Sequence, residues 1–71
     1  MTRILWTVHR NGIVAQAVIE DLGVNGVELI IMTSAASPRN IGRFANLDVA
    51  RQQASLERAG FIQAGWTESP V

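Results

Sequence analysis

Residues 3–20 read RILWTVHRNGIVAQAVIE, and the Asn11-Gly12 pair divides this stretch into two runs that mirror each other in hydrophobicity. A two-residue type I′ turn needs φ > 0 at both central positions, which Asn and Gly adopt more readily than other residues. Asn-Gly between alternating apolar residues is therefore a strong short-range signal for a β-hairpin. The sequence predicts strands over residues 3–10 and 13–20.

The predicted turn also fixes how the two strands pair. One face of the hairpin is apolar, and a large Trp lies opposite a small Ala on it. The other face is mostly polar and pairs Arg3 with Glu20, which are opposite charges. The pairs expected on the apolar face are Arg10–Ile13, Val8–Ala15, Trp6–Ala17 and Ile4–Ile19.

Residues 27–33 are rich in β-forming side chains and predict a third strand. A tight turn on Asn25-Gly26 would place Glu28 on the same face as Trp6 and send the apolar residues to the polar face. Burial decides the register where one face is apolar, so we expect a longer loop instead. The residues then expected on the Trp6 face are Val27, Leu29 and Ile31.

Residues 47–59 have the composition of a helix, with signals at both ends. Asn46 is a favoured N-cap, and Asp48 lies in the first turn, where the helix dipole favours an anion. Gly60 can adopt the left-handed conformation that ends helices, and Arg58 lies in the last turn. The sequence predicts a helix over 47–59.

The predicted helix carries apolar residues on two sides, and only one side can pack on the sheet. Val49 and Leu56 are seven residues apart and form the stripe with the larger side chains. We therefore expect these two residues to face the sheet. The opposite stripe, expected to be exposed or to meet a second helix, consists of Leu47, Ala50 and Ala54.

The fold class that follows is α+β, an antiparallel meander of three or four strands with one C-terminal helix packed on one face. Residues 39–44 are a candidate fourth strand. Residues 61–67 read either as a short final strand or as a tail that docks its aromatic side chains. We expect one domain over residues 1–71, with a frayed tail at about 68–71.

Five segments mark the turns, the core and the end of the helix: Trp6-Thr7, Arg10-Asn11-Gly12, Gly26-Val27-Glu28, Arg43-Phe44 and 56–61. In this order they resemble short uncharacterised bacterial proteins. The resemblance spans about residues 6–61 and implies an antiparallel sheet followed by one helix, with no functional site to carry over. The chain departs from that pattern at Ser37-Pro38 and by continuing to Trp66, which leaves the fourth strand open.

Composition limits the classes of function. The formal net charge is zero, 48% of the residues are hydrophobic, and there is no Cys, which excludes a disulfide scaffold and a thiolate metal site. The sequence shows neither a signal-peptide pattern nor an apolar run long enough to span a bilayer. We expect a cytoplasmic protein that has no membrane partner.

The expected function is binding or self-association without catalysis, with a homodimer or another protein as the partner. A core this small leaves apolar surface exposed, and one helix cannot cover both faces of a sheet. Trp is the residue most enriched at interface hot spots. The expected interface residues are Leu5, Val14 and Val18 on the polar face of the hairpin, and Trp66.

An alternative is weak nucleic-acid binding through the Arg-bearing helix and the segment before it. Asp48 and Glu57 lie in the same helix and favour an ordinary solvated face instead. No catalytic or cofactor site is expected, because the sequence contains no catalytic or nucleotide-binding motif, and no metal site is expected, because His9 is the sole histidine and there is no Cys. The residues of the alternative are Arg39, Arg43, Arg51 and Arg58.

Overall fold

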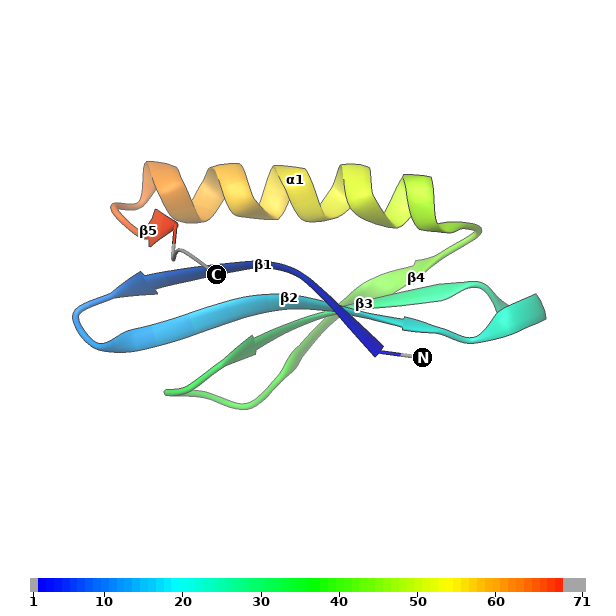
Figure 1. Ribbon diagram of the computed structural model, residues 1–71, viewed down its shortest axis with the longest axis horizontal. Coiled ribbons are helices and arrows are strands. Elements are labelled where there is room, and N and C mark those ends of the chain that lie inside the picture. Colours follow the sequence, from blue (N-terminus) through cyan, green and yellow to red (C-terminus); the bar gives the residue numbers. More distant parts are fainter. Residues whose placement is uncertain (1, 69–71) are drawn as a thin grey trace.

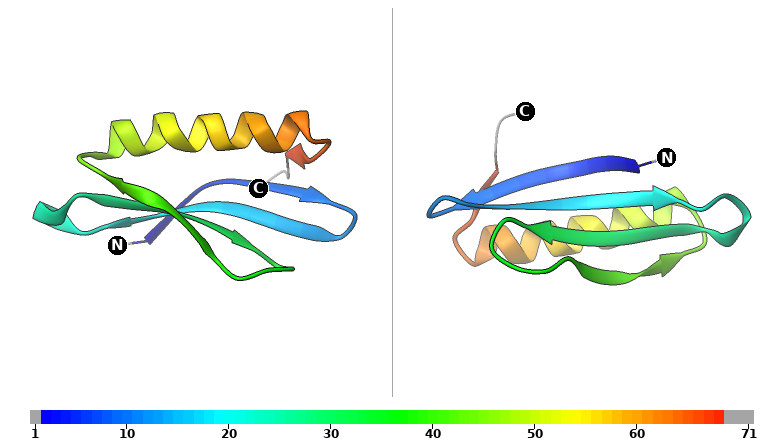
Figure 2. Two further views of the ribbon diagram at one scale, coloured as in Figure 1. Left: turned by 180° about the vertical axis from the view of Figure 1, so that it is seen from behind. Right: turned by 90° about the horizontal axis from the view of Figure 1, so that it is seen from below.

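The computed structural model describes residues 2–68, and these form an antiparallel sheet with a single helix lying along one face (Figure 1). The helix runs along most of the length of the sheet, and the opposite face has no second layer in the described part of the chain (Figure 2). The elements are β1 (Thr2–Arg10), β2 (Ile13–Asp21), β3 (Val27–Thr33), β4 (Arg39–Phe44), α1 (Leu47–Gln63) and β5 (Thr67–Glu68).

The strand order across the sheet is β4-β3-β2-β1-β5. The predicted α+β class is confirmed, but the described sheet has five strands rather than three or four. Residues 39–44 do form the fourth strand, and β5 adds a two-residue strand at the edge of β1. Glu68, predicted to begin a frayed tail, belongs to β5; residues 69–71 of that predicted tail lie outside the described residues.

The Asn11-Gly12 turn has the predicted geometry. Asn11 has φ of 51° and Gly12 has φ of 81°, as a type I′ turn requires. Trp6 lies opposite Ala17, as predicted, and both belong to or pack against the core. The turn therefore sets the register of the hairpin from Arg10 back to Trp6.

A β-bulge between Ile4 and Trp6 changes the register of the first half of β1. Ile4 lies opposite Val18 and Arg3 lies opposite Ile19, so the predicted pairs Ile4–Ile19 and Arg3–Glu20 are wrong. The extra residue lets two consecutive apolar side chains, Leu5 and Trp6, pack on the same core. Strict alternation would have left Leu5 in water, so burial explains the bulge.

The register of β3 follows burial, as predicted. Ile31 lies opposite Ala17 and Leu29 lies opposite Ile19, and all four are buried in one cluster on the helix side. The loop before β3 contains a short 3₁₀ helix, Gly23–Asn25, rather than a two-residue turn. The apolar face therefore overrides the turn propensity of Asn-Gly at this position.

The helix begins where the sequence predicts and ends later. The Asn46 side chain accepts a hydrogen bond from the Val49 amide at 3.0 Å, which confirms the N-cap. The predicted end at Ala59 is wrong, because α1 continues through Gly60 to Gln63.

Gly65, rather than Gly60, provides the left-handed residue that follows the helix, with φ of 97°. The Trp66 amide donates to the Phe61 carbonyl at 3.0 Å, and the Gly65 amide donates to the Ile62 carbonyl at 3.1 Å. These two hydrogen bonds form a Schellman motif. The additional turn places Phe61 against Trp6 and Trp66, with ring centroids 5.6 and 5.1 Å away.

The stripe predicted to face the sheet is the wrong one. Leu56 is 67% exposed and Val49 is 41% exposed, whereas Ala50 and Ala54 are fully buried. The sheet supplies the bulky side chains of the core, so small residues on the helix allow the two layers to approach closely. The Trp6 indole N–H donates to the Ala54 carbonyl at 2.9 Å, a contact that needs this close approach.

Candidate functional site

The face of the sheet opposite α1 is a candidate binding surface, which we call the open face. Val18 lies at its centre, opposite Ile4 on β1 and opposite Ile30 on β3, so the three form an apolar row across the sheet. Val18 is only 6% exposed because its neighbours flank it, whereas Ile4 is 55% exposed. The apolar residues of the open face are Ile4, Val14, Val18, Ile30 and Met32.

One end of the open face is hollowed and the other end is charged. The hollow measures about 270 Å³ and is lined by Val14, Gln16 and Met32 together with the start of the next loop. At the charged end Glu20 lies opposite Glu28. Glu28 forms an ion pair with Arg43 at 3.9 Å, so the end carries both signs of charge.

The structure places the predicted interface residues in three different settings. Val14 and Val18 lie on the open face, as expected. Leu5 does not: the bulge turns it towards α1, where it packs against the core. Trp66 is half-buried and packs edge-on against Phe61, with an interplanar angle of 81°.

The outer edge of β1 borders a second candidate surface. β5 pairs with β1 only at Val8 and His9, so the edge of residues 2–7 has no strand partner within the described chain. A groove of about 440 Å³ lies between this edge and α1. We call it the basic groove, and its charged residues are Arg3, Arg51, Arg58 and Glu68.

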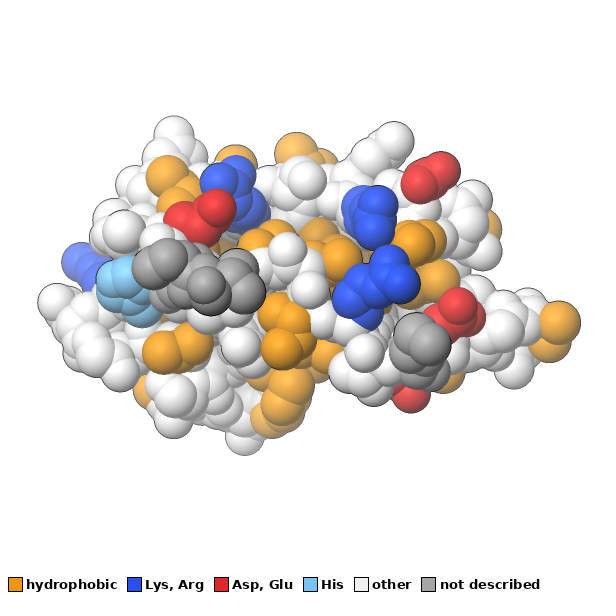
Figure 3. Space-filling view, in the orientation of Figure 1, with side chains coloured by type: hydrophobic (Ala, Val, Ile, Leu, Met, Phe, Trp, Pro, Cys, Tyr) orange, Lys and Arg blue, Asp and Glu red, His pale blue; other side chains and the backbone are white. Residues whose placement is uncertain are grey.

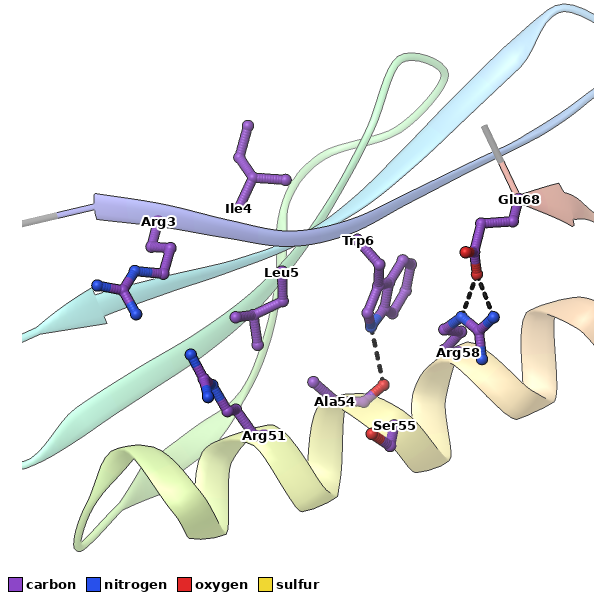
Figure 4. A pocket seen from close by; sticks show the side chains of 9 residues that line it. All are labelled: Arg3, Ile4, Leu5, Trp6, Arg51, Ala54, Ser55, Arg58 and Glu68. Carbon is purple, nitrogen blue, oxygen red and sulfur yellow. Dashed lines mark hydrogen bonds and ion pairs between the residues drawn. The ribbon is translucent and has the colours of Figure 1, made fainter. Parts of the chain in front are cut away.

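The side chains of the basic groove come from both of its walls (Figure 4). Arg3, Leu5 and Trp6 point from β1 towards the helix, while Ile4 points away to the open face. Arg51 projects from α1 towards β1, and Arg58 forms an ion pair with Glu68 of β5. Figure 3 faces this side of the molecule and shows Arg side chains gathered between the helix and the sheet.

The four Arg residues of the nucleic-acid alternative do not form one surface. Arg39 and Arg43 belong to β4, at the opposite edge of the sheet from the groove. Arg39 pairs with Glu57 at 3.1 Å, and Arg43 pairs with Glu28. Only Arg51 and Arg58 line the basic groove.

Arg3 is a basic residue of the groove that was not predicted from the sequence. The regular strand pattern placed it on the polar face beside Glu20, whereas the bulge moves it to the helix side. Among residues 2–68, neither Arg3 nor Arg51 has an ion-pair partner. The adjacent apolar pair Leu5-Trp6 is the signal that could have indicated the bulge.

Metal-ligating side chains do not form a site in the described part of the chain. No group of three or more His, Cys, Asp or Glu side chains within residues 2–68 could hold a metal ion. The Asp21 carboxylate accepts a hydrogen bond from the Gly23 amide at 2.9 Å, and the Thr2 hydroxyl donates to Glu20.

No described helix has the length and apolar character needed to cross a membrane.

Comparison of the chain with known protein families, curated proteins and solved structures found no match.

Proposed function

We propose that this protein acts by binding rather than by catalysis, and that its open face pairs with a second copy of the chain. The observation that carries the proposal is the apolar row of Ile4, Val18 and Ile30 on a sheet face that no other described element covers. Met32, beside this row, is 43% exposed. Contiguous apolar surface of this kind is typical of interaction sites.

The open face fits another sheet better than it fits a pocket-bound small molecule. Two sheets can pack face to face about 10 Å apart with their side chains interdigitating. The hollow beside Met32 offers space for a side chain from the other sheet. A two-fold arrangement uses the same patch on both copies and is the commonest form of homo-oligomer.

Charge does not oppose the pairing of two copies. The formal net charge of the chain is zero, so no long-range repulsion keeps the copies apart. The charged end of the open face carries Glu20, Glu28 and Arg43, and these residues suit the polar rim of an interface.

The test is sedimentation equilibrium over a micromolar to millimolar concentration series, with two matched variants. Met32→Glu puts a charge on the open face, and we expect it to weaken association at least about tenfold, because an interface core tolerates unpaired charge poorly. Val24→Glu adds the same charge in the fully exposed 3₁₀ segment and is expected to leave association unchanged. Equal effects of the two variants, or a mass of 7.7 kDa at every concentration, would contradict the proposal.

A further inference from the structure

The edge of β1 that has no described strand partner and the charges beside it point to a second ligand, on a different surface from the open face. Residues 2–7 of β1 have β2 on one side and no described strand on the other. An unpaired edge presents backbone N–H and C=O groups that can pair with another extended chain. The basic groove continues from this edge up to α1, so it has room for an added strand.

The chain itself contains a precedent for such a strand. β5 pairs antiparallel with β1 at Val8 and His9, in line with the part of the edge that has no described partner. Its Glu68 side chain reaches across to Arg58 on α1. A strand at this edge can therefore hydrogen-bond to β1 through its backbone while its carboxylate binds an arginine of the helix.

Further along the groove, Arg3 and Arg51 have no such partner among residues 2–68. Arg51 lies on α1 seven residues before Arg58, two helical turns or about 10 Å away, which an extended chain spans in about three residues. Arg3 faces Arg51 from β1 (Figure 4). Among the charged residues that line the groove, Glu68 is the sole acid, and Arg58 already binds it.

We propose that the basic groove binds an extended acidic peptide segment, added as an antiparallel strand to residues 2–7 of β1, with its carboxylates on Arg3 and Arg51. In this mode of recognition the backbone hydrogen bonds supply affinity, and the side chains supply specificity. The charge-assisted hydrogen bonds from the two guanidinium groups select carboxylates.

A second copy of β1 is a poor occupant of the groove. The strand reads TRILWTVHR and contains no acidic residue, so edge-to-edge pairing would bring cations next to cations. Residues 69–71, outside the described part of the chain, read Ser-Pro-Val and bring no acidic side chain. The proposed ligand therefore differs from β1 in carrying acidic side chains.

The experiment measures the fluorescence anisotropy of a labelled, capped six-residue peptide of alternating Glu and Val, titrated with the full chain. We expect binding that weakens as salt rises, and at least about tenfold weaker binding to the double variant Arg3→Gln/Arg51→Gln. Arg39→Gln, on the opposite edge of the sheet and outside the open face, is the matched control and is expected to change the affinity less than twofold.

Two further probes separate strand addition from simple attraction of anions. The same peptide with alternate backbone amides N-methylated keeps its charge but loses half of its amide donors, and we expect it to lose binding. A single-stranded oligothymidine of four nucleotides without terminal phosphates carries the same charge as the peptide, about three negative charges, without a peptide backbone and is expected to bind more weakly than the peptide. Binding that survives methylation, tighter binding of the oligonucleotide, or no peptide binding at millimolar protein would overturn the proposal.

Discussion

Trp6 joins the two layers of the molecule through one hydrogen bond and one ring contact. Its indole N–H donates to the Ala54 carbonyl at 2.9 Å. Its ring packs edge-on against Phe61, which in turn contacts Trp66. The indole therefore fixes how far the helix stands from the sheet as well as filling space in the core.

Trp6→Phe keeps an aromatic ring and removes the indole donor. We expect the free energy of unfolding to fall by about 1–3 kcal/mol, because a hydrogen bond and part of a large ring are lost together. Urea unfolding followed by circular dichroism measures the change. Trp66→Phe, at a ring near the end of the described chain, is the comparison. If Trp6→Phe lowers the free energy of unfolding no more than Trp66→Phe does, the role of Trp6 in joining the helix to the sheet is contradicted.

At the scale of the elements, local sequence and packing together determine where the helix ends. Gly60 and Gly65 can both end a helix, and only the second does so. The difference lies outside the helix, because the turn between them brings Phe61 to Trp6. Local sequence offers the possible ends, and burial of an aromatic ring selects one.

Substitution of the two glycines by Ala distinguishes these helix ends. An added Cβ at Gly60 meets nothing within 4 Å, so Gly60→Ala is expected to stabilise the protein by about 0.5–1 kcal/mol. Gly65 has φ of 97°, where a Cβ is strained, so Gly65→Ala is expected to destabilise it by roughly 1–2 kcal/mol. Thermal unfolding of both variants shows whether each change stabilises or destabilises the protein. A destabilising Gly60→Ala together with a stabilising Gly65→Ala would place the helix end at Gly60.

The orientation of the helix can be tested on the two stripes. Ala54 is buried against the sheet, so Ala54→Leu is expected to overpack the core and cost about 1–3 kcal/mol. Leu56 is 67% exposed, so Leu56→Ala is expected to change stability by less than about 0.5 kcal/mol. Chemical denaturation measures both, and a large cost at Leu56 with none at Ala54 would mean that the helix is rotated.

At the scale of the whole molecule, features set by neighbouring residues could be predicted and those set by packing could not. The type I′ turn and the Asn46 cap depend on a few adjacent residues, and both are present as predicted. The register of β3 was predictable because one face of the sheet is strongly apolar. The stripe of the helix that faces the sheet could not be predicted, because it depends on which layer supplies the large side chains of the core.

Of the two candidate surfaces, one could be predicted from the sequence and the other could not. The open face could be anticipated, since a single helix leaves one side of a sheet bare, and Val14 and Val18 were expected there. The basic groove could not, because it requires the bulge that turns Arg3 and Leu5 towards the helix and the pairing of β5 with β1. Both features arise from contacts between distant parts of the chain.

The most direct test of the central claim, that the open face pairs two copies, is methyl NMR over a dilution series from about 1 mM to 10 μM. We expect the methyl groups of Ile4, Val18 and Met32 to shift together with one dissociation constant. The methyl groups of Leu29 and Ile31, buried on the helix side, should stay nearly constant. Shifts confined to the helix side, or none at any concentration, would contradict the account.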